Sequence, residues 1–318
     1  MNRVVRAVPA RAGWTLRLVA VTACAAALLA AMGGSALAKK PKPKPKKPTI
    51  TPKTVITKGS GYLALGDSVT FGYEEAQVVP APNYADASSF TAYPELLGRE
   101  LHLTVANAAC SGETSASLID ATAQSNGCEN SPGGGPGYRT QFPLHVHYNG
   151  SQLGYAVSYL KKHQNVRLVS LMIGANDFFL CQETTPDKCT SLTEQATVIG
   201  TVEKNVKTIL STIRKKAHYN GQIVIVNYYA LDYSNAAAAG QSALLNSSID
   251  SAARPFHVEF ADGFGSFEAA TLHSGGNSCT AGLLTQLHGS TTGPCGIHPS
   301  IAGQSLLAQA VENAIRLG

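Results

Sequence analysis

From residue 59 onward, short apolar runs rich in β-branched residues alternate with segments whose apolar residues recur every three or four positions. The first pattern predicts buried strands, and the second predicts helices that bury one face. Such alternation favours a mostly parallel sheet with helices on both of its faces. We therefore predict one α/β domain over residues 59–318. Its strands are expected over 61–65, 103–107, 166–173, 222–228 and 256–260.

The clearest helical pattern runs from Val198 to Ile213. It ends in Arg214-Lys215-Lys216, and basic residues in a last turn complement the negative end of a helix dipole. A weaker helical pattern covers residues 114–121. The Gly- and Pro-rich stretch 131–137 indicates a loop. Further helices are expected over 93–101, 151–162, 236–253 and 300–316.

The charge of the chain is divided between two parts. The first 58 residues carry 12 Lys and Arg residues and no acidic one, so the remainder has 13 basic and 20 acidic residues and a net charge of −7. Nucleic-acid binding needs a basic surface for the phosphates. We therefore predict that the domain binds no nucleic acid.

Residues 1–38 have the pattern of a secretory signal peptide. Four Arg residues precede an apolar run from Leu18 to Met32, and Ala36-Leu37-Ala38 fits a cleavage site. The run is too short for a membrane span. Acylation of Cys24 is the alternative, which the apolar residues beyond it disfavour. We expect a secreted protein.

Residues 39–58 form a Lys/Pro-rich linker, a composition that favours an extended segment. We expect it to act as a spacer, with contact to an anionic lipid or cell surface as the alternative. The domain itself is expected to be a monomer that uses no cofactor.

Six cysteines remain besides Cys24, and an even number in an exported chain predicts disulfides. No Cys-x-x-Cys occurs, which argues against a zinc site. His145 and His147 lack a third ligand nearby in the sequence, so no metal site is expected there either. The cysteines fall into three local pairs: Cys110 with Cys128, Cys181 with Cys189, and Cys279 with Cys295.

Ser68 stands directly after the predicted strand 61–65, in the sequence Gly66-Asp67-Ser68. The carboxyl ends of strands are where open α/β sheets bind ligands. A serine in that place is a candidate nucleophile, provided that a neighbouring base takes its proton. The Gly-x-Ser-x-Gly elbow of α/β-hydrolases is absent from the chain, which argues against that fold.

Later segments supply the other groups that acyl transfer needs. Gly112 follows a predicted strand, so its backbone N–H is a candidate donor to an oxyanion, and the side-chain amide of Asn176 is another. His298, before Pro299 and the last helix, is the candidate base. Each of these residues alone has an ordinary structural explanation, such as a turn glycine or a loop cap. Together they fall at one edge of a parallel sheet.

This ordered set resembles the four blocks of the GDSL, or SGNH, hydrolase family, and the resemblance covers residues 60–318. It implies a flavodoxin-like three-layer α/β/α fold and ester hydrolysis. It also implies Ser68 as nucleophile and oxyanion donor, Gly112 and Asn176 as further donors, and His298 as general base and acid. The likeness is greatest to secreted, disulfide-bonded bacterial lipases and esterases. The matching blocks are Gly66-Asp67-Ser68-Val69, Gly112, Gly174-x-Asn176-Asp177 and His298-Pro299.

One position departs from the family pattern. The family usually has an aspartate two or three residues before the histidine, where this chain has Gly296 and Cys295. An imidazole still needs an acceptor that fixes its tautomer. We expect a backbone carbonyl of Cys295 or Gly296 in this role, which would give a Ser–His dyad. A remote carboxylate, from Asp67 or Asp177, is the alternative.

The sequence therefore predicts a secreted serine esterase or lipase that acts on small-molecule or lipid esters through an acyl-enzyme. Two other functions stay open at this point. One is a carbohydrate O-acetylesterase of the same fold. The other is a non-catalytic protein that binds the cell surface.

Overall fold

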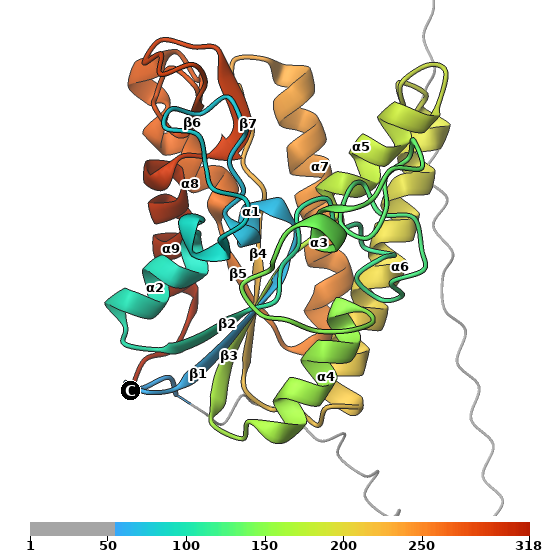
Figure 1. Ribbon diagram of the computed structural model, residues 1–318, viewed down its shortest axis with the longest axis vertical. Coiled ribbons are helices and arrows are strands. Elements are labelled where there is room, and N and C mark those ends of the chain that lie inside the picture. Colours follow the sequence, from blue (N-terminus) through green and yellow to red (C-terminus); the bar gives the residue numbers. More distant parts are fainter. Residues whose placement is uncertain (1–54) are drawn as a thin grey trace, which may run out of the picture. The chain divides into compact units, whose positions relative to one another are not determined.

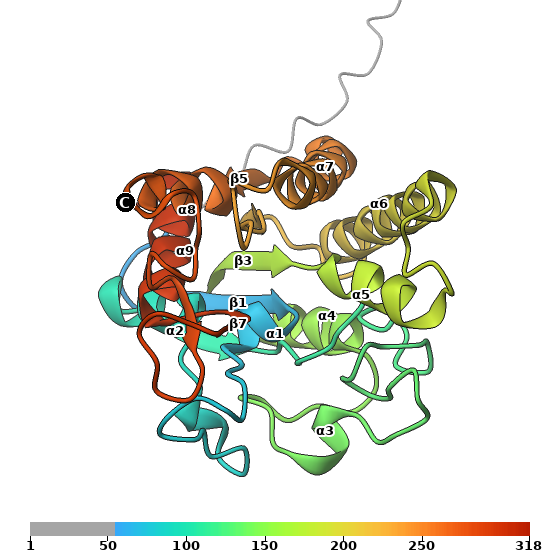
Figure 2. The same cartoon turned by 90° about the horizontal axis from the view of Figure 1, so that it is seen from above.

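The structure is a computed structural model that describes residues 55–318. The predicted signal peptide and most of the predicted linker lie outside the described residues. A five-stranded sheet in the order β2-β1-β3-β4-β5 forms the centre of the fold (Figures 1 and 2), and its four strand pairs are all parallel. This confirms the predicted α/β fold, and the order is the flavodoxin-like one. The strands are Gly61–Gly66 (β1), Thr104–Asn107 (β2), Val166–Met172 (β3), Gln222–Val226 (β4) and Glu259–Ala261 (β5).

Helices cover both faces of this sheet, which gives the predicted three layers (Figure 2). On one face, α2 (Tyr93–Glu100) packs against α9 (Ile301–Ala314), and α8 (Gly263–Ala270) packs beside α9. The other face carries α4, α6 and α7, with α5 packed against α6. The bounds of these four helices are Gln152–Lys162 (α4), Ala175–Thr184 (α5), Leu192–Lys215 (α6) and Ala236–Ala253 (α7).

The central strands were predictable because both of their faces are covered. Every residue of β1 and β4 is buried, and a strand buried on both sides shows an unbroken apolar run. Strand β5 begins three residues later than predicted, because Arg254–Phe256 forms a 3₁₀ turn that contains Pro255.

Residues 114–121 form turns and not the predicted helix. The hydroxyl of Ser117 accepts a hydrogen bond from the backbone N–H of Thr114, and the hydroxyl of Thr114 accepts one from the N–H of Ser117. Side chains that bond the local backbone in this way compete with helix formation.

A small antiparallel hairpin, not predicted from the sequence, lies after η3. It consists of β6 (Leu284–Gln286) and β7 (Cys295–Pro299). His298 therefore lies in a strand, whereas the sequence predicted a loop or a helix start. Two further helical turns, α1 (Ser68–Phe71) and α3 (Tyr138–Gln141), lie above the sheet (Figure 1).

All three predicted disulfides are present: Cys110–Cys128, Cys181–Cys189 and Cys279–Cys295. The third joins the segment before β6 to the first residue of β7. The covalent link therefore holds together the hairpin that carries His298.

The folded part begins slightly earlier than residue 59. Ile56, which the sequence assigned to the linker, is buried and forms a β-bridge with Leu317 near the end of the chain. Within residues 55–318, no helix has the length and apolar character that crossing a membrane requires.

Gly303 lets α9 pack closely against its neighbours. A methyl group on this residue would lie 2.3 Å from the carbonyl oxygen of Leu283 and 2.9 Å from the ring of Phe267. We expect Gly303→Ala to lower the free energy of unfolding by about 1–3 kcal/mol, the usual cost of overpacking. Urea denaturation of the purified protein measures this.

The matched control is Gly200→Ala in α6, where a methyl group would meet nothing within 4 Å. Because alanine restricts the unfolded chain more than glycine does, this variant should be more stable by up to about 1 kcal/mol. Equal destabilisation of both variants would contradict the packing argument.

Candidate active site

Ser68 is the first residue of α1, directly after the carboxyl end of β1. The turn between them depends on Gly66, because a Cβ there would lie 2.3 Å from the carbonyl oxygen of Met172. The side chain of Asp67 caps α1 by accepting a hydrogen bond from the N–H of Val69 at 3.0 Å. Gly72 ends the helix in the left-handed conformation. Ser68 is thus fixed on a single, capped helical turn.

His298 approaches Ser68 from β7. Its Nε2 atom lies 3.0 Å from Oγ of Ser68, although the two residues are 230 positions apart in the sequence. The structure therefore brings together the predicted nucleophile and the predicted base at hydrogen-bond distance.

The other ring nitrogen of His298 faces Glu75, a residue that the sequence did not identify. Its Nδ1 atom lies 2.8 Å from Oε1 of Glu75. This corrects the expectation that a backbone carbonyl of Cys295 or Gly296 would hold the ring. The acceptor is a carboxylate from the loop that follows α1, seven residues after Ser68.

Glu75 is held by the hairpin that carries the histidine. The backbone N–H of Ile297 donates to Oε1 at 2.8 Å, and the hydroxyl of Thr285 donates to Oε2 at 2.5 Å. Burial alone would raise the pKa of Glu75, but the hydrogen bond and charge of His298, together with the Thr285 hydroxyl, lower that pKa to about 2. Glu75 is therefore a carboxylate at neutral pH.

Gly296 makes room for this carboxylate. A Cβ on Gly296 would lie 2.1 Å from both Cδ and Oε1 of Glu75. The position where the family pattern led us to look for an acid is thus a glycine because the acid arrives there from another segment.

Gly112 and Asn176 lie where the sequence predicted oxyanion donors. Gly112 has φ of 81°, and a Cβ would meet the carbonyl oxygen of Asn126 at 2.5 Å, so only glycine fits. Asn176, in the first turn of α5, is buried. Its side-chain oxygen accepts a hydrogen bond from Nδ2 of Asn126 at 3.2 Å. This bond fixes the amide with its NH₂ group left to donate elsewhere.

A buried network ties the segment of Gly112 to the end of β1. The side chain of Gln152 accepts from the N–H of Gly66 at 2.6 Å and donates to its carbonyl oxygen at 3.0 Å. It also donates to Oε2 of Glu113 at 2.9 Å, and Ser117 donates to the other carboxyl oxygen. Burial, and next the charge of Glu129, raise the pKa of Glu113.

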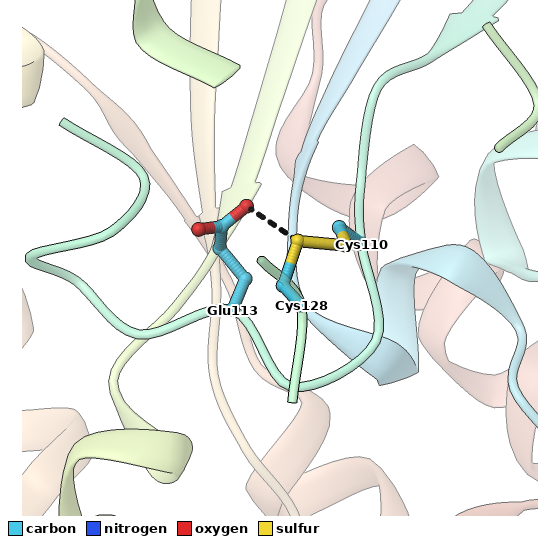
Figure 3. A group of neighbouring side chains, drawn as sticks. All are labelled: Cys110, Glu113 and Cys128. Carbon is cyan, nitrogen blue, oxygen red and sulfur yellow. Dashed lines mark hydrogen bonds between the residues drawn. A yellow bond between two sulfur atoms is a disulfide. The ribbon is translucent and has the colours of Figure 1, made fainter. Parts of the chain in front are cut away.

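Glu113 also lies beside the disulfide of Cys110 and Cys128 (Figure 3), with Sγ of Cys128 3.6 Å from a carboxyl oxygen. The three side chains are close enough to surround an ion. Both sulfurs are used in the disulfide, however, and metal binding by cysteine requires thiolates. We therefore interpret this group as a structural one.

Asp67 and Asp177, the alternative acids, are engaged elsewhere. Asp67 accepts a hydrogen bond from the hydroxyl of Tyr228 as well as from Val69. Asp177 accepts from the N–H and the hydroxyl of Ser115, at 2.8 and 2.6 Å. Burial raises the pKa of each aspartate to about 6. Both hold loops of the site in place.

Aromatic residues pack around the histidine. The ring of Tyr73 meets that of His298 edge to face, with 5.0 Å between centroids. The hydroxyl of Tyr229 donates to the carbonyl oxygen of Ile297 at 2.6 Å. His145, one of the two histidines examined as metal ligands, instead has its Nε2 2.9 Å from the carbonyl oxygen of Phe71.

A cavity of about 200 Å³ opens beside Ser68, between α5 and α7. Asn176 and His298 also face it. The rest of its wall is mostly apolar: Val69, Ala175, Phe178, Phe179, Leu231, Ala238, Leu245 and Ile297.

Two solved structures illustrate the likeness in fold. A phospholipase A1 from Streptomyces albidoflavus is 21% identical, with a TM-score of 0.51 over 80% of this chain and 99% of that chain. An acetylxylan esterase from Geobacillus stearothermophilus is 16% identical, with a TM-score of 0.48 over 82% of this chain and 96% of that one. A comparison with curated proteins found no match.

A family model describes most of the chain. Residues 64–306 match the GDSL-like Lipase/Acylhydrolase family, and this range contains Ser68, Glu75, Gly112, Asn176 and His298. The match extends over well more than half of the sequence and over the whole sheet. The chain belongs to the GDSL-like lipase/acylhydrolase family.

Proposed function

We propose that this protein is a secreted serine esterase that hydrolyses carboxylic esters with Ser68, His298 and Glu75 as a catalytic triad. One observation carries the proposal: hydrogen-bond distances of 3.0 and 2.8 Å connect the serine to the imidazole and the imidazole to the carboxylate. Membership of an acylhydrolase family supports the reaction class. Three disulfides and the N-terminal sequence pattern support an oxidising compartment outside the cell.

In the acylation step, His298 accepts the proton of Ser68 while Oγ forms a bond to the ester carbonyl carbon. Glu75 keeps the other proton of the ring on Nδ1 and stabilises the imidazolium that forms. The negative charge on the carbonyl oxygen is held by the amide of Asn176 and the backbone N–H groups of Gly112 and Ser68. Within residues 55–318, these two N–H groups donate to no other protein atom.

The tetrahedral intermediate then breaks its bond to the alcohol oxygen, which leaves with the proton from His298. Water attacks the acyl-enzyme in the second half of the reaction, with His298 again as the base. The carboxylic acid leaves, and the hydroxyl of Ser68 is restored. Each step uses only groups that lie within hydrogen-bond reach of one another.

Replacing either member of the Ser–His pair should abolish turnover. We expect Ser68→Ala and His298→Ala to lower kcat on 4-nitrophenyl butyrate by about 10⁴-fold or more. Ser247→Ala, at an exposed position of α7, is the matched control and should behave as wild type. Near-wild-type turnover by Ser68→Ala would show that another residue is the nucleophile.

Glu75→Gln keeps the shape of the side chain but removes its charge. We expect kcat to fall by about 10²–10⁴-fold with little change in KM, because the imidazolium loses its partner. The neighbouring Glu74→Gln is the control and should change kcat by less than about threefold, since the nearby Glu74 makes no contact with the ring of His298. With a pKa of about 2 for Glu75, the loss should be constant between about pH 5 and 9. Equal losses in the two variants would argue against the triad.

Gly296→Ala tests whether the glycine serves Glu75. The added methyl group should displace the carboxylate from Nδ1 and lower kcat by about tenfold or more. If this is its mechanism, Gly296→Ala should cost little in a Glu75→Gln background with a relaxed side chain, so the two losses should not add. Steady-state kinetics of the four proteins measure the coupling. Additive losses would show that Gly296 acts independently of Glu75.

A further inference from the structure

The cavity beside Ser68 is built from facing sides of two helices. Its residues on α7 are spaced three or four apart, which places them on one side of that helix. On α5, Phe178 and Gln182 are spaced in the same way. Phe178 and Leu245 are buried, whereas Leu231 and Ile297 are each 42% exposed. The cavity therefore runs from a closed interior next to Ser68 to an apolar opening. The α7 residues are Ala238, Gln241, Ser242 and Leu245.

The walls offer little to a polar ligand. Asp67 is the carboxylate among the lining residues, and it is buried and already bonded to Tyr228 and Val69. The side-chain oxygen of Asn176 is bonded to Asn126. A sugar or a charged head group needs several unpaired polar partners in its site. An alkyl chain needs none, so the cavity fits an alkyl chain better.

The position of the histidine indicates which part of the ester enters. The leaving alcohol must take its proton from Nε2 of His298, so it lies on the side of β7. In both views, α5 lies on the other side of α1 from β7 (Figures 1 and 2). The cavity between α5 and α7 is therefore on the side left for the acyl group.

The volume limits the length of that group. At about 30 Å³ for each water molecule, the cavity of about 200 Å³ has room for roughly seven groups of that size, and a methylene is of similar size. It is also smaller than the about 300–1,000 Å³ of pockets that enclose drug-sized ligands. Because the opening is apolar, longer chains can extend out of it without further contact.

We propose that this cavity binds the acyl chain of the substrate and that the enzyme prefers medium-chain acyl esters of about six to eight carbons. The inference rests on the proposed function, since it takes Ser68 as the nucleophile. It also favours acyl esters of this length over acetyl groups on carbohydrates.

Two ester series test the proposal on the purified protein. With 4-nitrophenyl esters from C2 to C16, kcat/KM should rise by about fourfold for each added methylene, the worth of burying one. The rise should stop near C8. With butanoyl esters of alcohols from methyl to octyl, kcat/KM should change little. A rise in the alcohol series alone, or a steady decline from C2, would overturn the proposal.

Ser242→Phe places a ring in the middle of the cavity wall. We expect it to lower the ratio of octanoyl to acetyl kcat/KM by about tenfold or more. Ser247→Phe, on an exposed position of the same helix, should leave that ratio unchanged. If Ser242→Phe fails to fold, Ala238→Leu, nearer the opening, should lower the same ratio by a smaller factor. An unchanged ratio in folded Ser242→Phe or Ala238→Leu would contradict the assignment.

Labelling with a fluorophosphonate separates this inference from the proposed function. If Ser68 is labelled and hydrolysis depends on it, but the acyl series is flat, only the acyl-chain assignment fails. If Ser68→Ala keeps its activity or its label, the proposed function fails, and the acyl-chain assignment fails with it. Labelling that depends on Ser68, together with the rise toward C8, supports both.

Discussion

The ion pair between Glu75 and His298 is the contact on which the geometry of the site depends. It joins a loop near the start of the domain to a strand near its end, across 223 residues. The hairpin β6–β7 reinforces it, because Thr285 and Ile297 bond the same carboxylate. The Cys279–Cys295 disulfide then stiffens that hairpin. Without the pair, nothing in the described residues would fix the tautomer of the ring that faces Ser68.

Below this contact, the buried polar groups of the site are paired with one another. Gln152 satisfies both backbone groups of Gly66 and also a carboxyl oxygen of Glu113. Tyr228 bonds Asp67 from the other side. Because unpaired polar groups are costly in a protein interior, such a network has one favourable arrangement and resists others. The nucleophile and the oxyanion donors are thereby held in place before substrate arrives, which is the condition for electrostatic catalysis.

Sequence reasoning succeeded where a local pattern reports on burial. The apolar runs of β1, β3 and β4 predicted the sheet, and residues after these strands, such as Ser68 and Asn176, necessarily share one edge. It failed at β6 and β7, which are too short for any periodicity, and at 114–121, where Thr114 and Ser117 bond the backbone. Glu75 could not be found in this way. Its position depends on how a loop folds against the hairpin, and only its closeness to Ser68 in the sequence gave any signal.

The missing aspartate before His298 is therefore a different solution and not a loss. A side chain at position 296 would occupy the space of the Glu75 carboxyl group, and residue 295 is committed to a disulfide. An acid supplied from the histidine's own strand and an acid supplied from the loop after α1 thus exclude each other at this place. Because Glu75 follows the nucleophile by only seven residues, the acid and the serine move as parts of one segment. The histidine alone must be positioned from a distance, and the hairpin, its disulfide and the carboxylate all act on that one ring.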